Sequence, residues 1–423
     1  MLKKNYKFFF LIFISLVIFY RSPYIFTNGR FYSLDLIYHL KLSSLNFIES
    51  ILFIDFSARY INLISNISSI ISSRFFELSS SQYVAVYLSF LIYILIIYLI
   101  LFKPSLYFTR NYQRYLFAIL FVVCPVMSFE IWLNAINLQV YLGLLTLILF
   151  FIIPESNNEK YIYFLLILIS GLSGIYACAL LPLYIFKFLT DKNKYNATCC
   201  LILFFCCCVQ IYIIYLSFSY VEILIGRNSS LGFTFTKYEA ISYTYNVFVR
   251  AFFGSTFPKS ILSLIGLDLK TVLTTNEIKN NLFYLFIILL VICLIALLFL
   301  TRFLNIHKDK VVYYLVFAFL IISFVVIFGG LSDSLHGRYS SINGIILILI
   351  CLKLFETFKS NFLKSIFLLL ILSSIFFGIL DFRLKEYIYY LDCIECPNWN
   401  EEVRKYNLDK NYQLNAWPYH INR

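Results

Sequence analysis

Long apolar runs dominate the chain, and short clusters of charged residues separate them. A helix that crosses a bilayer needs about 20 mostly apolar residues. The pattern therefore predicts an all-α polytopic membrane protein with about 10–11 transmembrane helices. The predicted spans lie at about 8–20, 83–102, 115–130, 136–153, 161–178, 178–190, 197–218, 282–301, 311–329, 342–358 and 363–380.

Composition supports this prediction. Hydrophobic residues make up 61% of the 423-residue chain and charged residues only 13%, whereas a soluble domain has about 25% charged residues. The net charge of +12 does not indicate a nucleic-acid partner, because the 34 Lys and Arg residues are spread over loops and tails. We interpret the excess of cations as a signal of membrane orientation.

The positions of the cations orient the chain. Lys187, Lys192 and Lys194 follow the apolar stretch 161–190, and the positive-inside rule places such residues in the cytoplasm. That stretch is therefore predicted to form a helical hairpin that turns near 174–181. A cytoplasmic N-terminus then places a cation in every inner loop, namely 103–114, 154–160, 187–196, 302–310 and 359–364.

The opposite face receives most of the remaining polar sequence. We expect a transmembrane domain over 1–380 and an extracytoplasmic tail over 381–423. Apolar and polar residues alternate with helical period over 60–76, which predicts an amphipathic helix lying in the membrane interface. The other outer segments are the loops 21–82, 219–281 and 330–341.

Asp35 is the first acidic residue after the first apolar run, and His39 would share its helix face four residues later. A carboxylate at the membrane surface could act as a general base on a sugar hydroxyl, or it could be a solvated loop acid. Glu130 and Asn134 lie in a tight turn between two apolar helices. An acid is costly near the membrane plane unless it is useful, although both residues could instead mark a helix end.

The segment 329–339 places Asp333, His336 and Arg338 between two predicted membrane helices. Arginine presents a rigid fork of donors that suits phosphate, and the alternative is an anchor at the lipid headgroups. Arg250 lies in the basic and aromatic loop 219–281, a composition that suits sugars and lipid phosphates but also a wet interfacial loop.

Cys393 and Cys396 form a CxxC pair in the tail, where a disulfide could persist outside the cytoplasm. A zinc site of this kind needs a second pair, so no metal is expected. The chain has no GxxxxGK[ST], HExxH or GxSxG pattern, which removes support for a P-loop ATPase, a zincin and an α/β-hydrolase.

Several short pieces of sequence carry a resemblance in layout to bacterial membrane glycosyltransferases of the GT-C type. These enzymes use a polyprenyl-phosphate sugar as donor, and the serotype-converting glucosyltransferases that decorate O-antigen are similar in size. The pieces are Gly29-Arg30-Phe31 followed by Asp35, the turn 134–138, Gly171-Leu172-Ser173-Gly174 leading to Leu181-Pro182-Leu183, His336-Gly337-Arg338-Tyr339, and Pro397-Asn398-Trp399 with Trp417-Pro418.

The resemblance implies inverting sugar transfer on the extracytoplasmic side. Asp35 would accept the proton of the acceptor hydroxyl, and Arg338 with Arg250 would stabilise the departing phosphate. His336, Glu130 and Asn134 are expected to help bind substrate. The implied partners are membrane lipids, a lipid-linked sugar and a glycan acceptor, with no nucleic acid and no cofactor.

Three other functions stay open. A polymerase of O-antigen or capsule also has many helices and arginines that bind lipid pyrophosphate, but its usual emphasis is on two central loops. A transporter or flippase would be expected to have charged or glycine-broken helices and an internal repeat, whereas the middles of these helices are nearly uncharged. A purely structural membrane protein is the third alternative.

Overall fold

The structure is a computed structural model that describes residues 2–56, 58–125, 131–224, 245–254, 310–329, 337–382 and 398–416. Within these residues the chain is almost wholly helical, which confirms the predicted helical class. One two-residue antiparallel pair joins β1 (Ile54–Asp55) to β2 (Tyr60–Ile61), with Asp55 opposite Tyr60.

The helices follow one another as α1 (Leu2–Arg21), α2 (Pro23–Thr27), α3 (Ser33–Ser43), α4 (Phe47–Ile51), α5 (Leu63–Phe75), α6 (Leu78–Phe102), α7 (Asn111–Val123), α8 (Gln139–Phe151), α9 (Asn157–Gly171), α10 (Ile175–Ala179), α11 (Leu181–Asp191), α12 (Lys194–Leu224), the π-helix η2 (Tyr245–Val249), α14 (Arg250–Phe253), α18 (Lys310–Gly329), α19 (Gly337–Thr357), α20 (Asn361–Leu380) and α22 (Trp399–Leu408).

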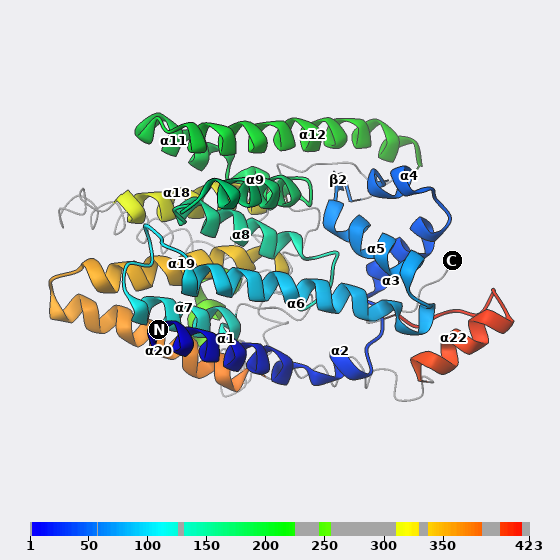
Figure 1. Cartoon of the computed structure of the whole chain (residues 1–423), viewed down its shortest axis with the longest axis horizontal. Helices are drawn as coiled ribbons and strands as arrows, with labels where there is room; N and C mark the ends of the chain where they lie inside the picture. Colours follow the sequence, from blue (N-terminus) through cyan, green and yellow to red (C-terminus); the bar gives the residue numbers. More distant parts are fainter. Residues whose placement is uncertain are drawn as a thin grey trace, which may run out of the picture.

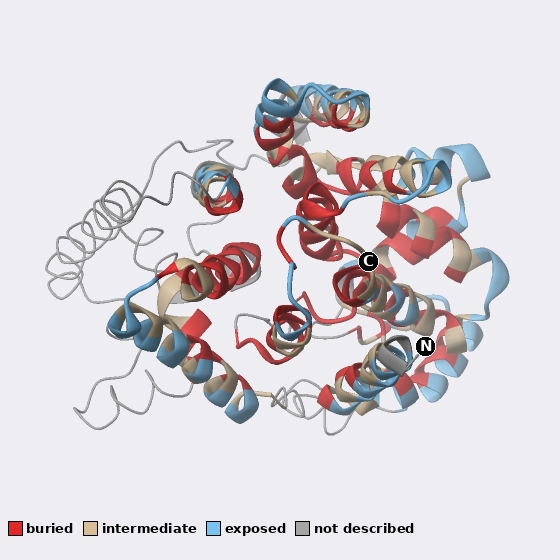
Figure 2. Cartoon of the chain, turned by 60° about the vertical axis from the view of Figure 1, so that its left-hand side comes forward, coloured by how far each residue is buried: buried red, intermediate tan, exposed pale blue. Residues whose placement is uncertain are grey.

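Most of the long helices run along the long axis of the molecule, and the short helices gather at one end of it. Figure 1 shows α6, α12 and α19 lengthwise, with α3, α4, α5 and α22 together at the right-hand end. The central helix is α8, in which every residue after Gln139 is buried. Figure 2 shows buried faces turned inward and exposed faces turned outward around this core.

Three of the described helices are long and apolar enough to cross a membrane, namely Leu78–Phe102, Lys194–Ser217 and Asn361–Leu380. A fourth candidate is the pair Asn157–Gly171 and Ile175–Asp191, which bends by 111°. The bend falls beside the predicted hairpin turn, at Gly174, whose φ of +127° favours glycine. These apolar helices indicate an association with membrane.

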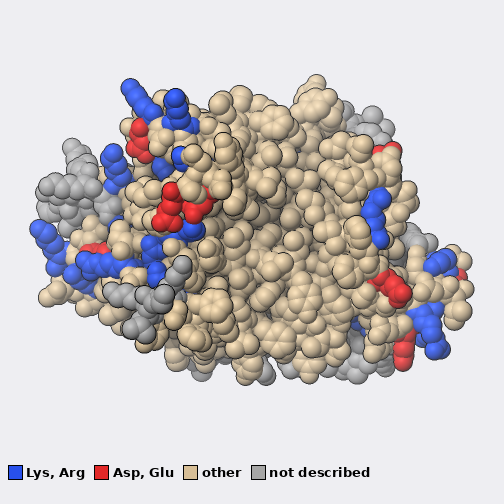
Figure 3. All heavy atoms as spheres, viewed as in Figure 1, with Lys and Arg blue, Asp and Glu red and all other residues tan. Residues whose placement is uncertain are grey.

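Helices also occupy the other predicted spans, at least in part, except that the segment 282–301 lies outside the described residues. On the face drawn in Figure 3, charged side chains gather at the two ends and an uncharged belt separates them. Large apolar side chains are exposed along α1, α12 and α20, among them Phe9, Leu201 and Leu369. Such an apolar surface is typical of contact with lipid.

At the end where α1 begins and α6 ends, cationic side chains donate to carbonyls at helix C-termini and in the loop that follows α6. Arg114 donates to the carbonyl oxygens of Ile100 at 2.7 Å, Lys103 at 2.6 Å and Phe108 at 2.7 Å. Lys187 donates to the carbonyl of Phe150 near the end of α8. The last four carbonyls of a helix lack intrahelical donors, and these side chains supply them. Arg114 and Lys187 are buried as a result, whereas the sequence predicted both in cytoplasmic loops.

The helix predicted at 60–76 exists as α5, but its polar face does not face water as an interfacial helix requires. Ser72 Oγ lies 2.8 Å from Nδ1 of His39. The side-chain amide of Asn66 donates to the carbonyls of Ile51 and Phe53, at 2.9 Å each. The serine and asparagine residues are buried because α5 packs against α3 and α4.

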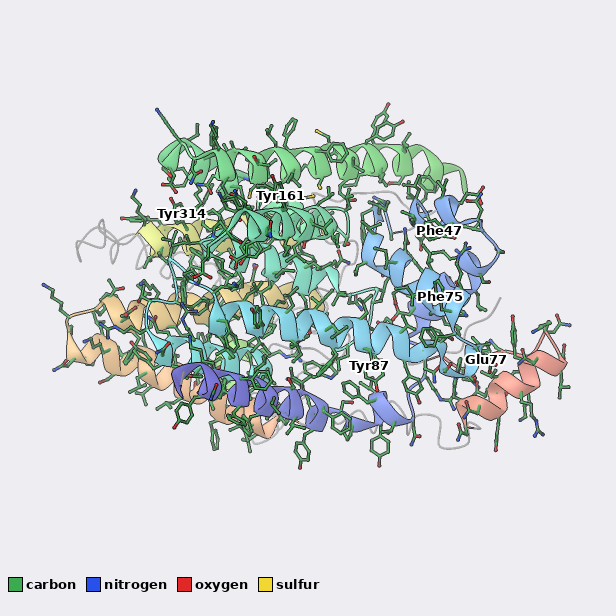
Figure 4. All side chains as sticks on the ribbon, viewed as in Figure 1. Phe47, Phe75, Glu77, Tyr87, Tyr161 and Tyr314 are labelled. Atoms are coloured by element: carbon green, nitrogen blue, oxygen red, sulfur yellow. The ribbon has the colours of Figure 1, made fainter. Side chains whose placement is uncertain are left out.

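Exposed aromatic residues mark the ends of this packed unit. Phe75 at the end of α5 is 76% exposed and Phe47 at the start of α4 is 55% exposed, and both lie at the end of the molecule that holds α3 (Figure 4). The guanidinium of Arg74 lies 5.7 Å from the ring centroid of Phe47. Aromatic rings beside a cation are common at the boundary between lipid and water.

We expect Arg114→Met to destabilise the protein by about 2–4 kcal/mol, because buried carbonyls would lose charged donors. Chemical unfolding of the purified protein in detergent measures this loss. The matched control is Arg110→Met, whose side chain is 64% exposed and ion-paired to Glu356, and we expect it to cost less than about 1 kcal/mol. Equal losses in the two variants would contradict the capping role.

Candidate functional site

Asp35 lies in the first turn of α3 and is buried, with 4% of its surface exposed. Its Oδ1 accepts the backbone N–H of Ile136 at 2.9 Å and its Oδ2 accepts that of Ala135 at 3.2 Å. A carboxylate in the first turn of a helix also interacts favourably with the helix dipole. The carboxylate therefore joins α3 to a segment that lies 100 residues further along the chain.

The segment 131–138, which leads into α8, is folded so that these two N–H groups point at Asp35. Leu133 adopts a φ of +49°, a left-handed conformation that costs a non-glycine residue about 1–2 kcal/mol. Asn134 Oδ1 accepts the N–H of Asn137 at 3.0 Å. The side-chain amide of Asn62 donates to the carbonyl of Ile136 at 2.9 Å. These bonds hold the turn in its strained shape.

Burial determines the ionisation of Asp35. Loss of hydration raises its pKa to about 7, and the bonds from Ala135 and Ile136 oppose that rise only in part. At neutral pH the carboxyl group thus exists in both protonated and ionised forms. A group in this state can accept a proton and return it.

His39 lies one turn beyond Asp35, but it has different partners. It bonds to Ser72 of α5, and its ring centroid lies 5.0 Å from that of Phe31. Burial lowers the pKa of His39 to about 4, so the imidazole is neutral at physiological pH. His39 therefore packs α3 against α5, and its described contacts do not make it an acid or base for the group at Asp35.

A second polar group lies next to α3. The side-chain amide of Gln139 donates to Tyr60 Oη at 2.6 Å, and Tyr60 stands opposite Asp55 in the strand pair. Burial, followed by the charges of Asp55 and Asp35, raises the pKa of Tyr38. Phenol, amide and carboxylate side chains can each hydrogen-bond a hydroxyl group.

Arg21 is a candidate binding residue that sequence reasoning missed. It is the last residue of α1 and only 3% exposed, and its Nη1 donates to the carbonyl of Val122 at 2.6 Å. Its guanidinium lies 4.5 Å from the ring centroid of Trp132. Trp132 belongs to the same segment 131–138 that binds Asp35, so one loop contacts both the acid and this cation.

The predicted residue Arg250 lies close to the same place. It follows the π-helix η2, and its Nε donates to the carbonyl of Pro125 at 3.0 Å, three residues beyond the partner of Arg21. π-Helical turns occur frequently at functional sites. The guanidinium groups of Arg21 and Arg250 therefore both lie at the C-terminal end of α7. The only sequence signal for Arg21 was its position at the end of the first apolar run.

The structure describes some of the remaining predicted site residues and not others. Asn134 lies in the turn beside Asp35, and Arg338 lies in the first turn of α19. Within the described ranges, no three His, Cys, Asp or Glu side chains gather so as to hold a metal ion. Glu130, His336, Cys393 and Cys396 lie outside the described residues.

Comparison with models of protein families, with curated proteins and with solved structures finds no match to this chain.

Stability should depend on pH through Asp35. Because its pKa of about 7 in the folded chain exceeds the value of about 3.9 for an unfolded chain, the folded state binds more protons between these values and loses stability as pH rises. We expect wild type to lose about 2–3 kcal/mol relative to Asp35→Asn between pH 5 and 8.

Thermal unfolding of both proteins at several pH values measures this difference. Glu401→Gln changes an exposed acid on α22 and should follow wild type across the range. A difference between wild type and Asp35→Asn that does not vary with pH would contradict the raised pKa.

Proposed function

We propose that the chain is a polytopic membrane glycosyltransferase of the GT-C type. It transfers a sugar from a polyprenyl-phosphate donor to a cell-surface glycan such as O-antigen, on the extracytoplasmic side of a bacterial inner membrane. The observation that carries this proposal is the buried carboxyl group of Asp35, whose pKa of about 7 suits a general base.

The distribution of charge supports the orientation. Lys7, Arg114 and Lys187 all bond to helix ends at the end of the molecule where α1 begins, and the positive-inside rule assigns such an end to the cytoplasm. The helix α3, which carries Asp35, lies at the opposite end with α5 and α22 (Figure 1). The N-terminus is then cytoplasmic, and Asp35 faces the outer side together with the described part of the tail.

The proposed reaction is a single displacement that inverts the anomeric carbon. Asp35 takes the proton from an acceptor hydroxyl as the oxygen of that hydroxyl bonds to the anomeric carbon. The bond from that carbon to the phosphate oxygen breaks, and the polyprenyl phosphate leaves with the electron pair. The acceptor hydroxyl would replace one N–H at the carboxylate, and Ala135 makes the longer of the two bonds.

Arginine side chains would stabilise the negative charge that develops on the departing phosphate. Arg250 and Arg338 hold this role in the proposal, and Arg21 joins them because it lies at the same helix end as Arg250. The Arg21 guanidinium lies between aromatic rings, 4.5 Å from the centroid of Trp132 and 5.5 Å from that of Phe382. The lipid phosphate delivers an activated sugar, so the reaction needs no nucleotide or other cofactor at this site.

The pair of arginines also favours a second candidate, a polymerase of O-antigen or capsule. Two guanidinium groups near one helix end suit the doubled charge of a lipid pyrophosphate. In that case the product would be a longer glycan chain and not a new branch.

Analysis of surface polysaccharide from cells that express wild type or Asp35→Asn distinguishes these functions, once equal amounts of protein in the membrane are confirmed. We expect wild type to add a side-chain sugar and Asp35→Asn to lower that addition at least about 100-fold, the effect of losing a general base. The control is Glu49→Gln, an exposed acid that caps α4, which should retain the addition.

One outcome would contradict the transferase, and a second would contradict only the role of Asp35. Unchanged sugars with altered chain length would indicate the polymerase. A side-chain sugar that persists in Asp35→Asn would remove Asp35 as the base.

A further inference from the structure

The described part of the C-terminal tail packs against the helix that carries Asp35. Trp399 at the start of α22 donates its indole N–H to the carbonyl of Leu78 at 3.1 Å. Its ring centroid lies 5.8 Å from that of Phe31. Phe31 and Leu36 of the first loop form one buried cluster with the tail, whose members are Trp399, Val403, Tyr406, Leu414 and Ala416.

An ion pair lies at the centre of this contact. Arg30 donates through Nη1 to Oε1 of Glu402, a residue with 0% of its surface exposed. Glu402 Oε2 also accepts the backbone N–H of Asn415 at 2.7 Å, and Arg30 Nη1 donates to the carbonyl of Asn415 at 3.1 Å. These bonds connect residues 30, 402 and 415, although Arg30 and Glu402 lie 372 residues apart in the sequence.

The connection to Asp35 is short. Leu36 follows Asp35 directly and is completely buried, in the cluster that the tail completes. Phe31 contacts Trp399 on one side and His39 of α3 on the other. Removal of the tail would expose Leu36 to water and loosen the first turn of α3, where Asp35 accepts its two N–H bonds.

We propose that Glu402 is a positioning residue for Asp35: its ion pair with Arg30 fastens the tail segment 398–416 over α3 and keeps the carboxyl group of Asp35 out of water. A fully buried carboxylate is seldom a net source of stability, because desolvation offsets the attraction of its partner. The pair does fix geometry, since Glu402 accepts from both Arg30 and the backbone of residue 415. The proposal rests on the proposed function for the consequence of burying Asp35, but its main test does not.

The matched variants are Glu402→Gln and Glu401→Gln, which remove the same charge from adjacent residues of α22, one buried and one exposed. Hydrogen exchange of the full-length protein in detergent reports on peptides that contain α3. We expect Glu402→Gln to raise the exchange rates of residues 33–43 at least about 10-fold through local opening, and Glu401→Gln to leave them within about 2-fold of wild type.

A second measurement separates positioning from general stability. In the wild-type background, we expect the stability difference caused by Asp35→Asn to vary with pH. In the Glu402→Gln background that variation should largely disappear, because water reaches Asp35, whereas a purely structural role would lower stability equally at every pH. The exchanged pair Arg30→Glu with Glu402→Arg should restore part of the protection of α3.

If Glu402→Gln does not fold, Arg30→Lys provides a milder test, since it keeps the charge but loses the planar fork. We expect Arg30→Lys to raise exchange in α3 by a smaller factor than Glu402→Gln. Unchanged exchange in α3, or an unchanged pH dependence in Glu402→Gln, would overturn the proposal. Faster exchange combined with a sugar addition that does not depend on Asp35 would support positioning and contradict the role of Asp35 as the base. Faster exchange with no sugar addition by wild type would support positioning and contradict the transferase.

Discussion

Backbone groups that lie out of reach of water must find their partners within the chain, and the described structure is arranged around this constraint. At one end of the bundle, Arg114 and Lys187 supply donors to the last carbonyls of α6 and α8. At the other end, the carboxylate of Asp35 accepts two N–H groups of the turn before α8. Charged side chains thus satisfy backbone groups at both ends of the described bundle.

The same constraint gives the candidate site its chemical character. A carboxylate that is buried in order to bond two N–H groups loses its hydration, and this loss raises its pKa. The segment 131–138 carries those N–H groups and also places Trp132 against Arg21. Acid and cation therefore both contact one loop, which suits a reaction that removes a proton and releases an anionic group.

The helical class and most helix positions could be predicted from the sequence, because long apolar runs have few other folds available to them. Asp35 could be proposed as a site from its position after the first run. The partners of Asp35 could not be predicted, since they lie 100 residues away and donate through backbone N–H groups. Every residue except proline has such a group, so the residue type does not reveal it. Arg21 was missed for a related reason: an arginine at the end of an apolar run resembles any headgroup anchor.

The errors concerned faces and loops. Periodicity over 60–76 predicted a polar face but could not show that α3 and α4 would cover it. The polar composition of the tail does not reveal that Glu402 would be buried beside Arg30. The periodicity of polar residues and the positions of charges predict which face of a segment is polar. They do not predict which distant segment packs against that face.

The most direct test of the account is infrared difference spectroscopy of the Asp35 carboxyl group, with wild type compared with Asp35→Asn as the pH is raised. The account predicts that wild type shows a carboxyl band that titrates with a midpoint near pH 7. The same band should be absent from Asp35→Asn. A midpoint near pH 4, the value of a solvated aspartate, would show that Asp35 is an ordinary hydrated acid and would contradict the proposed base.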